Sequence, residues 1–210
     1  MFTTFPGKGI CVGTPIRSEI LQGNSTRGKE FLQFSEEKPI LLGIGGSQGS
    51  QFLNTLLNAS IDELLPEMNI VWITGSANEQ SIAPRLGLRV FPYLQKELPD
   101  VLAVADVVVS RAGSNFLFEL ASLGKPMLLI PLASAAGDHQ TKNAEVFGEK
   151  NAATVLLEEN ATPERFCREV KRIFANENFR KSLGENAKKM AIPNVAEKIV
   201  QEVLQEIRKG

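Results

Sequence analysis

The sequence of 210 residues has few of the side chains that build disulfide or metal frameworks. Its two cysteines, Cys11 and Cys167, lie far apart and match neither a C-x-x-C motif nor a zinc-ligand spacing. Disulfide frameworks and structural metal sites are therefore not expected, and a reducing, cytoplasmic setting fits best. The sequence also has no D-x-D pair of carboxylates for a divalent ion. It predicts neither a metal-dependent mechanism nor a bound cofactor.

An excess of charge and long apolar runs are also absent. The chain has 23 basic and 24 acidic residues, so its net charge is -1 and nucleic acid is not an expected partner. No run approaches the roughly 20 apolar residues of a membrane span, and the start MFTTFPGKGI lacks the features of a signal peptide. Because Gly7, Gly9 and Pro15 are typical of a loop and strand from mid-chain, we expect this start to continue a preceding segment.

Short apolar runs alternate with helical patterns from Pro39 onward, as in βαβ units. Several runs are continuously apolar, which favours strands covered by helices on both faces. The predicted strands are residues 40–44, 69–74, 88–91, 106–110, 127–132 and 152–157. The predicted helices between them are residues 50–64, 77–86, 97–104, 114–123 and 139–150. The sequence thus predicts an α/β fold, with a Rossmann-like doubly wound parallel sheet of about six strands.

Helices are predicted on both sides of this region. Residues 18–38 read as one or two helices that lead into the first strand, and Thr162-Pro163-Glu164 is typical of a helix start. We expect helices from there to the end of the chain. The last of them has apolar residues at helical spacing on one face: Val195, Ile199, Val200, Val203, Leu204 and Ile207. We expect this face to pack against the chain's own sheet, and the alternative is that it docks to a domain outside this chain.

A glycine-rich turn joins the first predicted strand to a helix in PILLGIGGSQGSQFLNTLL. Gly45, Gly46 and Gly49 permit positive φ angles and a close approach to a ligand, and Ser47 and Ser50 offer hydroxyls at a helix N-terminus that favours anions. The spacing matches neither the Walker A motif nor the G-x-G-x-x-G fingerprint. Two interpretations stay open, a diphosphate-binding loop and a tight turn whose glycines serve packing alone.

A second small-residue turn follows the predicted strand DVVVS and starts the helix at Ser114. Glu119 stands among apolar neighbours, where its carboxylate suits the two hydroxyls of a ribose. The alternative is a solvated glutamate that compensates the helix dipole. Arg111, at the end of the strand, and Arg17, after Thr14-Pro15, each pair either with a phosphate or with an acid.

The third candidate segment is the loop PLASAAGDHQTKNAEVF, which ends in Asp138, His139, Gln140 and Asn143. His139 is the one histidine, and no acid stands at a triad-like spacing. We therefore interpret it as a hydrogen-bonding loop residue and not as a general base. All three segments follow strands, and in doubly wound folds ligands bind outside the carboxyl ends of the strands. The segments are expected to converge on one site.

Six motifs together resemble one family: V-G-T-P-I-R at 12–17, G-G-S-Q-G at 45–49, S-R-A-G-S at 110–114, E-L at 119–120, G-K-P at 124–126 and D-H-Q-x-x-N-A at 138–144. They are similar in order and near-identical in spacing to the MurG family, the N-acetylglucosaminyltransferases that act on the peptidoglycan lipid intermediate. The resemblance runs from about residue 10 to residue 200 and implies the C-terminal, donor-binding half of a GT-B glycosyltransferase.

The resemblance implies a role for each matched position. The glycine loop with Ser47 would bind the diphosphate with Arg17 nearby, the backbone of Leu94 would read the uracil edge, Glu119 would bind the ribose and Gln140 the N-acetylglucosamine hydroxyls. Asn115 and Phe116 depart from the family's usual residues. The full set of predicted substrate-binding residues is Arg17, Gly46, Ser47, Gln48, Gly49, Leu94, Arg111, Ser114, Asn115, Phe116, Glu119, His139, Gln140 and Asn143.

The family transfers N-acetylglucosamine from UDP to a lipid-linked muramoyl-pentapeptide at the cytoplasmic face of the membrane, with inversion. The resemblance implies three parts: an interdomain connection and lead-in helix (1–38), a UDP-sugar-binding domain (39–193) and a C-terminal helix (194–210). The acceptor domain and catalytic base would lie outside this chain, leaving it inactive alone. Alternatives are a separately encoded donor subunit of a two-component transferase, a non-catalytic nucleotide-sugar-binding module, and an unrelated doubly wound nucleotide enzyme.

Overall fold

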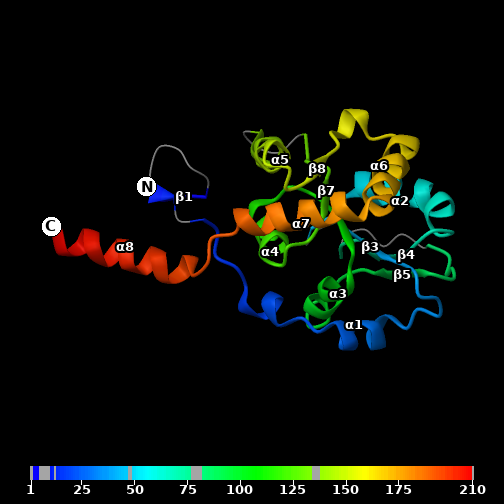
Figure 1. Ribbon diagram of the computed structural model, residues 1–210, viewed down its shortest axis with the longest axis horizontal. Coiled ribbons are helices and arrows are strands. Elements are labelled where there is room, and N and C mark those ends of the chain that lie inside the picture. The colour runs from blue at the N-terminus through cyan, green and yellow to red at the C-terminus, as the bar shows by residue number, and fades with distance from the viewer. Residues whose placement is uncertain are drawn as a thin grey trace.

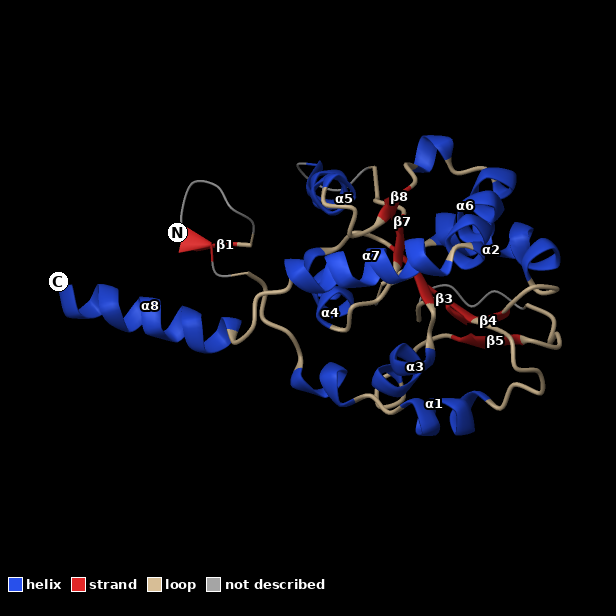
Figure 2. Ribbon diagram, viewed as in Figure 1, coloured by secondary structure: helices blue, strands red, loops and turns tan. Residues whose placement is uncertain are grey.

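A parallel six-stranded sheet forms the centre of the computed structural model, which describes residues 2–4, 10–11, 13–46, 49–76, 82–133 and 138–209. Its strand order is β5-β4-β3-β6-β7-β8, and Figure 2 shows β5, β4 and β3 in one half of the sheet and β7 and β8 in the other. The strands are β3 (Ile40–Ile44), β4 (Asn69–Ile73), β5 (Leu88–Phe91), β6 (Val107–Ser110), β7 (Met127–Leu129) and β8 (Thr154–Val155). The chain starts in the middle of the sheet, builds one half and returns beside its first strand. The predicted doubly wound fold is confirmed.

Helices cover both faces of this sheet (Figure 1). One face carries η1 (Ser18–Gln22), α1 (Ser25–Leu32), α3 (Leu98–Val104), α4 (Ser114–Ser122) and α5 (His139–Glu149). The other carries α2 (Gln51–Leu64) and α6 (Pro163–Ala175), and α7 (Glu177–Met190) contacts both α4 and α6. The remaining described elements are η3 (Glu158–Asn160), α8 (Val195–Lys209) and a small parallel pair, β1 (Phe2–Thr3) and β2 (Ile10–Cys11).

Alternation along each buried strand divides the apolar residues between two cores. In β3, Leu42 and Ile44 face the core under α3 and α4, whereas Leu41 faces the core under α2 and α6. In β4, Val71 and Trp72 divide in the same way. Successive strand side chains point to opposite faces, so a strand covered on both faces is apolar throughout. This is why the strands were recognisable as continuous apolar runs.

One predicted helix is wrong. Residues 82–86 of the helix expected at 77–86 form no helix, and residues 77–81 lie outside the described part of the chain. Pro84 has no backbone N–H and disfavours the helical conformation of the residue before it. The other helices predicted between strands and all six strands are present, with ends that differ by up to three residues. Strand β7, for example, ends at Leu129, three residues before the predicted end.

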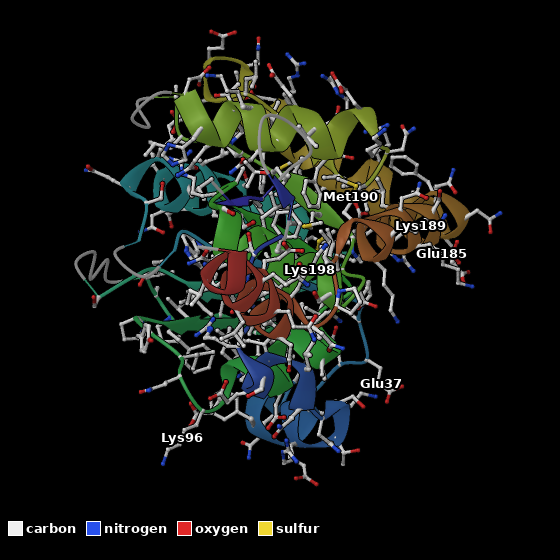
Figure 3. All side chains as sticks on the ribbon, turned by 90° about the vertical axis from the view of Figure 1, so that its left-hand side faces the viewer. Glu37, Lys96, Glu185, Lys189, Met190 and Lys198 are labelled. Atoms are coloured by element: carbon white, nitrogen blue, oxygen red, sulfur yellow. The ribbon has the colours of Figure 1, made fainter. Side chains whose placement is uncertain are left out.

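Helices α6 and α7 each begin after a residue whose side chain caps the helix. Thr162 accepts a hydrogen bond from the N–H of Arg165, and Pro163 occupies the first turn of α6. Helix α8 projects from the body of the molecule (Figure 1), and Figure 3 views it roughly along its axis, with Lys198 labelled. Its first residue, Val195, is buried, but four apolar side chains are 41–69% exposed: Val200, Val203, Leu204 and Ile207. The expectation that this face packs on the chain's own sheet is wrong beyond the first turns.

A buried asparagine fixes the helix that follows the glycine-rich turn. Asn54 of α2 is 0% exposed, accepts a hydrogen bond from Trp72 Nε1 at 3.0 Å and donates one to the carbonyl of Thr74 at 3.0 Å. Both partners belong to β4 or its carboxyl end. A buried donor or acceptor that loses its partner costs about 1–3 kcal/mol. Asn54 therefore sets the position of α2 against the sheet.

We expect Asn54→Ala to lower the free energy of unfolding by about 2–4 kcal/mol, because it leaves the Trp72 N–H and the Thr74 carbonyl buried without this partner. Urea unfolding followed by tryptophan fluorescence measures the change. Asn58→Ala, on the exposed side of the same helix, is the matched control and should change stability by less than about 0.5 kcal/mol. Equal effects of the two substitutions would contradict this role of Asn54.

Candidate donor-binding site

The switch point of the sheet brings the predicted site segments together. Strands β3 and β6 are hydrogen-bonded neighbours, with Ile44 opposite Ser110 at their carboxyl ends. Strand β7 pairs with β6, so the segments after all three strands leave the same edge of the sheet. Ligands of doubly wound proteins bind in the crevice at this position. The convergence predicted from the sequence is confirmed.

The glycine-rich turn lies between β3 and α2, and Ser47 and Gln48 of this turn lie outside the described residues. Gly46 and Gly49 have φ angles of +90° and +78°, which favour glycine. A Cβ atom at Gly45 would lie 2.6 Å from the backbone nitrogen of Ser50, so the turn needs glycine there for packing alone. No described atom lies within 4 Å of a Cβ atom placed at Gly46. Gly46 thus offers an open approach to the backbone, whereas Gly45 serves the turn itself.

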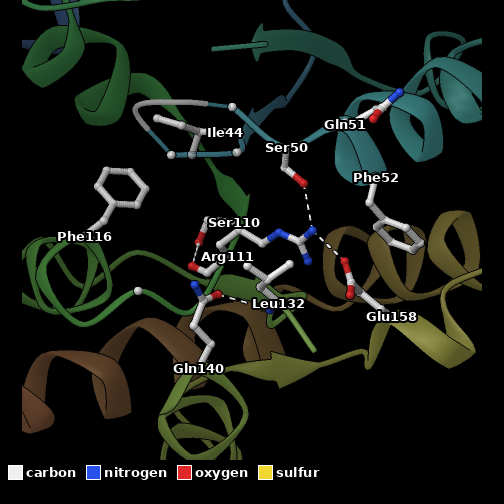
Figure 4. A pocket seen from close by; sticks show the side chains of 14 residues that line it. Ile44, Ser50, Gln51, Phe52, Ser110, Arg111, Phe116, Leu132, Gln140 and Glu158 are labelled. Atoms are coloured by element: carbon white, nitrogen blue, oxygen red, sulfur yellow. Dashed lines mark hydrogen bonds and ion pairs between the residues drawn. The ribbon is translucent and has the colours of Figure 1, made fainter. Parts of the chain in front are cut away.

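A cavity of about 460 Å³ opens beside this turn (Figure 4). The turn and the first residues of α2 form one wall, and the segments after β6, β7 and β8 form the other. Ser50 caps α2 by accepting a hydrogen bond from the N–H of Leu53 at 3.3 Å. The free N–H groups and the dipole of a helix N-terminus favour an anion. The cavity therefore combines a helix N-terminus with exposed glycine backbone.

Arg111 is buried in the wall of this cavity and connects four segments (Figure 4). Its Nη1 donates to the carbonyls of Ile130 and Pro131 at 3.1 and 3.3 Å. Its Nη2 donates to Ser50 Oγ at 2.8 Å and to Glu158 Oε1 at 2.5 Å. Of the two interpretations of Arg111, the structure shows the pairing with an acid. Arg111 thereby holds the ends of β6 and β7 and the start of α2 in one arrangement.

Glu119 lies in a second cavity and is paired with Arg17. The Arg17 guanidinium donates to both carboxylate oxygens, at 2.7 and 2.8 Å, and this hydrogen bonding raises the pKa of Arg17 above its ordinary value. The Glu119 side chain is 4% exposed, whereas that of Arg17 is 57% exposed. The alternative of a solvated glutamate is therefore wrong. Arg17 reaches Glu119 from the segment before η1, so the predicted connection contacts the predicted ribose site directly.

The second cavity has a volume of about 340 Å³ and adjoins the first, because Ile44, Gly46 and Phe116 line both. Its walls also include Leu94 and Asn115, as the sequence predicted, and Tyr93, which it did not. Tyr93 is 51% exposed and stands beside Leu94 after β5. The two cavities together form a continuous groove across the switch point.

Two other predicted residues, Asn143 and Ser114, hold the segments around the site in place. The Asn143 amide donates to the carbonyl of Ala112 at 2.9 Å and holds α5 against the segment after β6. Ser114 Oγ lies 3.1 Å from Thr14 Oγ1, so the segment before η1 also contacts the start of α4. Neither residue lines the two cavities in the described part of the chain. Their contacts position the loops that do.

The segment after β7 contributes Gln140 to the first cavity. Gln140 Oε1 accepts a hydrogen bond from the N–H of Leu132 at 3.1 Å, which fixes the two ends of the loop to each other. His139 begins α5 and lies outside the walls of both cavities. Residues 134–137 of this loop lie outside the described part of the chain. Gln140 thus lines the first cavity, and its contact with the sugar stays a prediction.

Glu158 is a site residue that the sequence reasoning missed. It begins η3, separated by two residues from the end of β8, and its Oε2 accepts a hydrogen bond from the N–H of Ala133 at 3.2 Å in addition to the pair with Arg111. The signal that identified the other segments, a polar residue just past a strand's carboxyl end, also applies to Glu158. Its ion-pair partner Arg111, however, is 47 residues away in the sequence, so the pair is apparent only in the folded structure.

The fold is that of one half of a GT-B glycosyltransferase. The profile of the glycosyltransferase family 28 C-terminal domain matches residues 40–199, and the chain belongs to this family. The resemblance drawn from the motifs is confirmed. Within the described residues, no helix is long and apolar enough to cross a membrane, and no cluster of His, Cys, Asp or Glu has the makings of a metal site.

Among its relatives, a protein of Geobacillus kaustophilus is 45% identical over 174 residues, which are 81% of this chain and 48% of that protein. It is named UDP-N-acetylglucosamine--N-acetylmuramyl-(pentapeptide) pyrophosphoryl-undecaprenol N-acetylglucosamine transferase. A second such transferase, from Bacillus cereus, is 41% identical over 198 residues, 90% of this chain and 56% of that protein. The chain therefore spans about half the length of the curated relatives it matches.

A crystal structure of MurG from Acinetobacter baumannii has the same fold. It superposes with a TM-score of 0.75 at 23% identity, covering 97% of this chain and 59% of that chain. At this identity the likeness shows the fold alone.

We expect Arg111→Ala to lower the free energy of unfolding by about 3 kcal/mol or more, because it leaves Glu158 and the carbonyls after β7 without their buried cation. Chemical denaturation measures this loss. Arg85→Ala is the matched control, since Arg85 pairs with Asp62 on the exposed surface, where such a pair contributes about 0–1 kcal/mol. A loss at Arg111 no larger than at Arg85 would argue against its role in the frame of the site.

Proposed function

We propose that this chain is the donor-binding half of an inverting hexosyltransferase that moves N-acetylglucosamine from UDP-N-acetylglucosamine to a lipid-linked muramoyl-pentapeptide. The observation that carries the proposal is the pair of adjoining cavities at the switch point, one with the buried carboxylate of Glu119 and one beside the glycine-rich turn. The family membership and the names of the relatives support the choice of donor and acceptor.

The two cavities suggest how the donor lies in the groove. The uridine would occupy the cavity lined by Leu94 and Glu119, with the ribose hydroxyls donating to the Glu119 carboxylate. The diphosphate would cross Gly46, which lines both cavities, next to the N-terminus of α2. The N-acetylglucosamine would then reach the cavity that holds Gln140. This order uses each cavity for the part of the donor whose chemistry its residues match.

In this arrangement the chain's own residues stabilise the departing UDP. An acceptor hydroxyl attacks the anomeric carbon, the bond from that carbon to the β-phosphate oxygen breaks, and negative charge grows on the diphosphate. The N-terminus of α2 and the exposed backbone of Gly46 stand where that charge would develop. Groups already oriented toward a developing charge lower the barrier without reorganising during the reaction. The donor half would thus stabilise the leaving group, and the acceptor half would supply the base.

We propose that both ends of this chain contact the acceptor half. Residues 1–38 would connect the acceptor half to the donor domain of residues 39–193, and residues 194–210 would return to the acceptor half. The exposed apolar side chains of α8 support this return, because an amphipathic helix with an uncovered apolar face is suited to packing against another surface. Through the acceptor half the enzyme would work at the inner face of the cell membrane.

Binding of the donor is tested first through Glu119. We expect UDP-N-acetylglucosamine to bind this chain, with UDP-glucose and GDP-mannose weaker, and Glu119→Ala to weaken binding by about tenfold or more because charge-assisted hydrogen bonds to the ribose are lost. Isothermal titration calorimetry measures each dissociation constant. The matched control is Glu149→Gln, at the exposed far end of α5. Binding that survives Glu119→Ala unchanged would refute the proposed ribose site.

Transfer is tested with the acceptor half supplied separately. We expect this chain alone to transfer little or no sugar to the lipid acceptor, and addition of the acceptor half of a relative to restore transfer. Ile207→Glu should weaken that restoration, because it places a charge on the exposed face of α8, yet leave the melting temperature of this chain within about 2 °C. Robust transfer by the chain alone would overturn the division of labour proposed here.

A further inference from the structure

Glu158 places a negative charge in the wall of the cavity that would hold the sugar end of the donor. Its side chain is 17% exposed, and it lines the first cavity together with Gln140, not the uridine cavity of Glu119. A carboxylate close to a bound diphosphate repels it, and partial burial screens that repulsion less than bulk water does. A neutral side chain of the same shape would accept the Ala133 hydrogen bond without this repulsion. Packing and the hydrogen bond from Ala133 therefore do not require Glu158 to be charged.

Arg111 and Glu158 carry the formal charges in the described wall of this cavity, and they cancel. Their atoms approach to 2.5 Å, and Arg111 also donates to Ser50, the cap of α2 (Figure 4). Arg111 alone would add a full positive charge beside the helix N-terminus, in a place where an anion is already favoured. With Glu158 present, the fold keeps the guanidinium as a connector of loops but removes most of its attraction for phosphate.

The difference matters because two related ligands would compete for this groove. UDP ends in a terminal phosphate whose second proton dissociates near pH ~6, by analogy with phosphate monoesters. In UDP-N-acetylglucosamine the same phosphorus carries the sugar, so at neutral pH UDP has one more negative charge. In the proposed arrangement that extra charge would lie in the first cavity, on the side of Glu158. The repulsion from Glu158 therefore acts most strongly on UDP.

We infer that Glu158 is a specificity-determining residue that disfavours UDP relative to UDP-N-acetylglucosamine by neutralising Arg111 at the sugar end of the groove. This inference rests on the proposed function. Because Glu158 offsets the positive charge of Arg111, the cavity attracts the terminal phosphate of the product UDP only weakly. UDP-N-acetylglucosamine has one negative charge fewer, so the carboxylate of Glu158 lowers its affinity less.

The test compares the dissociation constants of UDP and UDP-N-acetylglucosamine for the full chain at pH 7.5 and low ionic strength. In Glu158→Gln we expect UDP to bind on the order of fivefold more tightly relative to UDP-N-acetylglucosamine than in the unaltered chain, as expected for one unit charge in a partly screened setting. Glu159→Gln removes the same charge from the next, exposed residue and should leave the ratio unchanged. Glu158→Asp keeps the charge and should also keep the ratio.

A purely structural role of Glu158 would weaken both ligands together, and a ratio that stays within twofold in Glu158→Gln would overturn the inference. Glu158→Ser provides a second charge-removing variant of different shape, so that the result does not depend on the folding of one variant. It must shift the ratio in the same direction. If the unaltered chain bound neither ligand, the proposed function itself would fail. If it bound both and the variants left the ratio unchanged, the inference alone would fail.

Discussion

The pairing of β3 with β6 is the constraint on which the rest of the structure depends. These strands are 63 residues apart at Ile44 and Val107, yet they lie side by side because the chain builds one half of the sheet before it returns. The segments that follow them diverge to opposite faces, one into α2 and the other into α4. The groove between the two segments is a direct result of this topology. Every candidate ligand residue takes its position from it.

Two ion pairs, each with a largely buried carboxylate, keep this groove in shape. Arg111 with Glu158 fixes the loops on one side, and Arg17 with Glu119 fastens the segment before η1 on the other. Burying either carboxylate without its cation would cost several kcal/mol. Each carboxylate can therefore be buried here only because an arginine lies beside it. In the proposed function, a ribose that binds Glu119 would have to share or displace Arg17. The position of the segment before η1 would then be coupled to occupancy of the proposed ribose site.

The sequence predicted the sheet well because its strands are buried on both faces and need continuous apolar runs such as residues 40–44 and 106–110. It also predicted the edge of the sheet where the candidate site lies, because segments that follow parallel strands all leave the sheet at the same edge. It was wrong over residues 82–86, where helical spacing was given more weight than Pro84. It missed Glu158 and left Arg111 ambiguous, because a pair formed across 47 residues leaves no local pattern.

Amphipathic spacing indicates that one face of a helix is buried, but it does not show which surface covers that face. The spacing in α8 gave two readings, and the structure separates them along the helix: Val195 is buried at its start, whereas Ile207 is 69% exposed near its end. Glu119 shows the same limit for a polar residue, since apolar neighbours indicated an unusual carboxylate but not its partner. In both cases the local pattern identifies the residue that needs a contact. The contact itself is decided by segments distant in sequence, and for α8 we place it in the acceptor half.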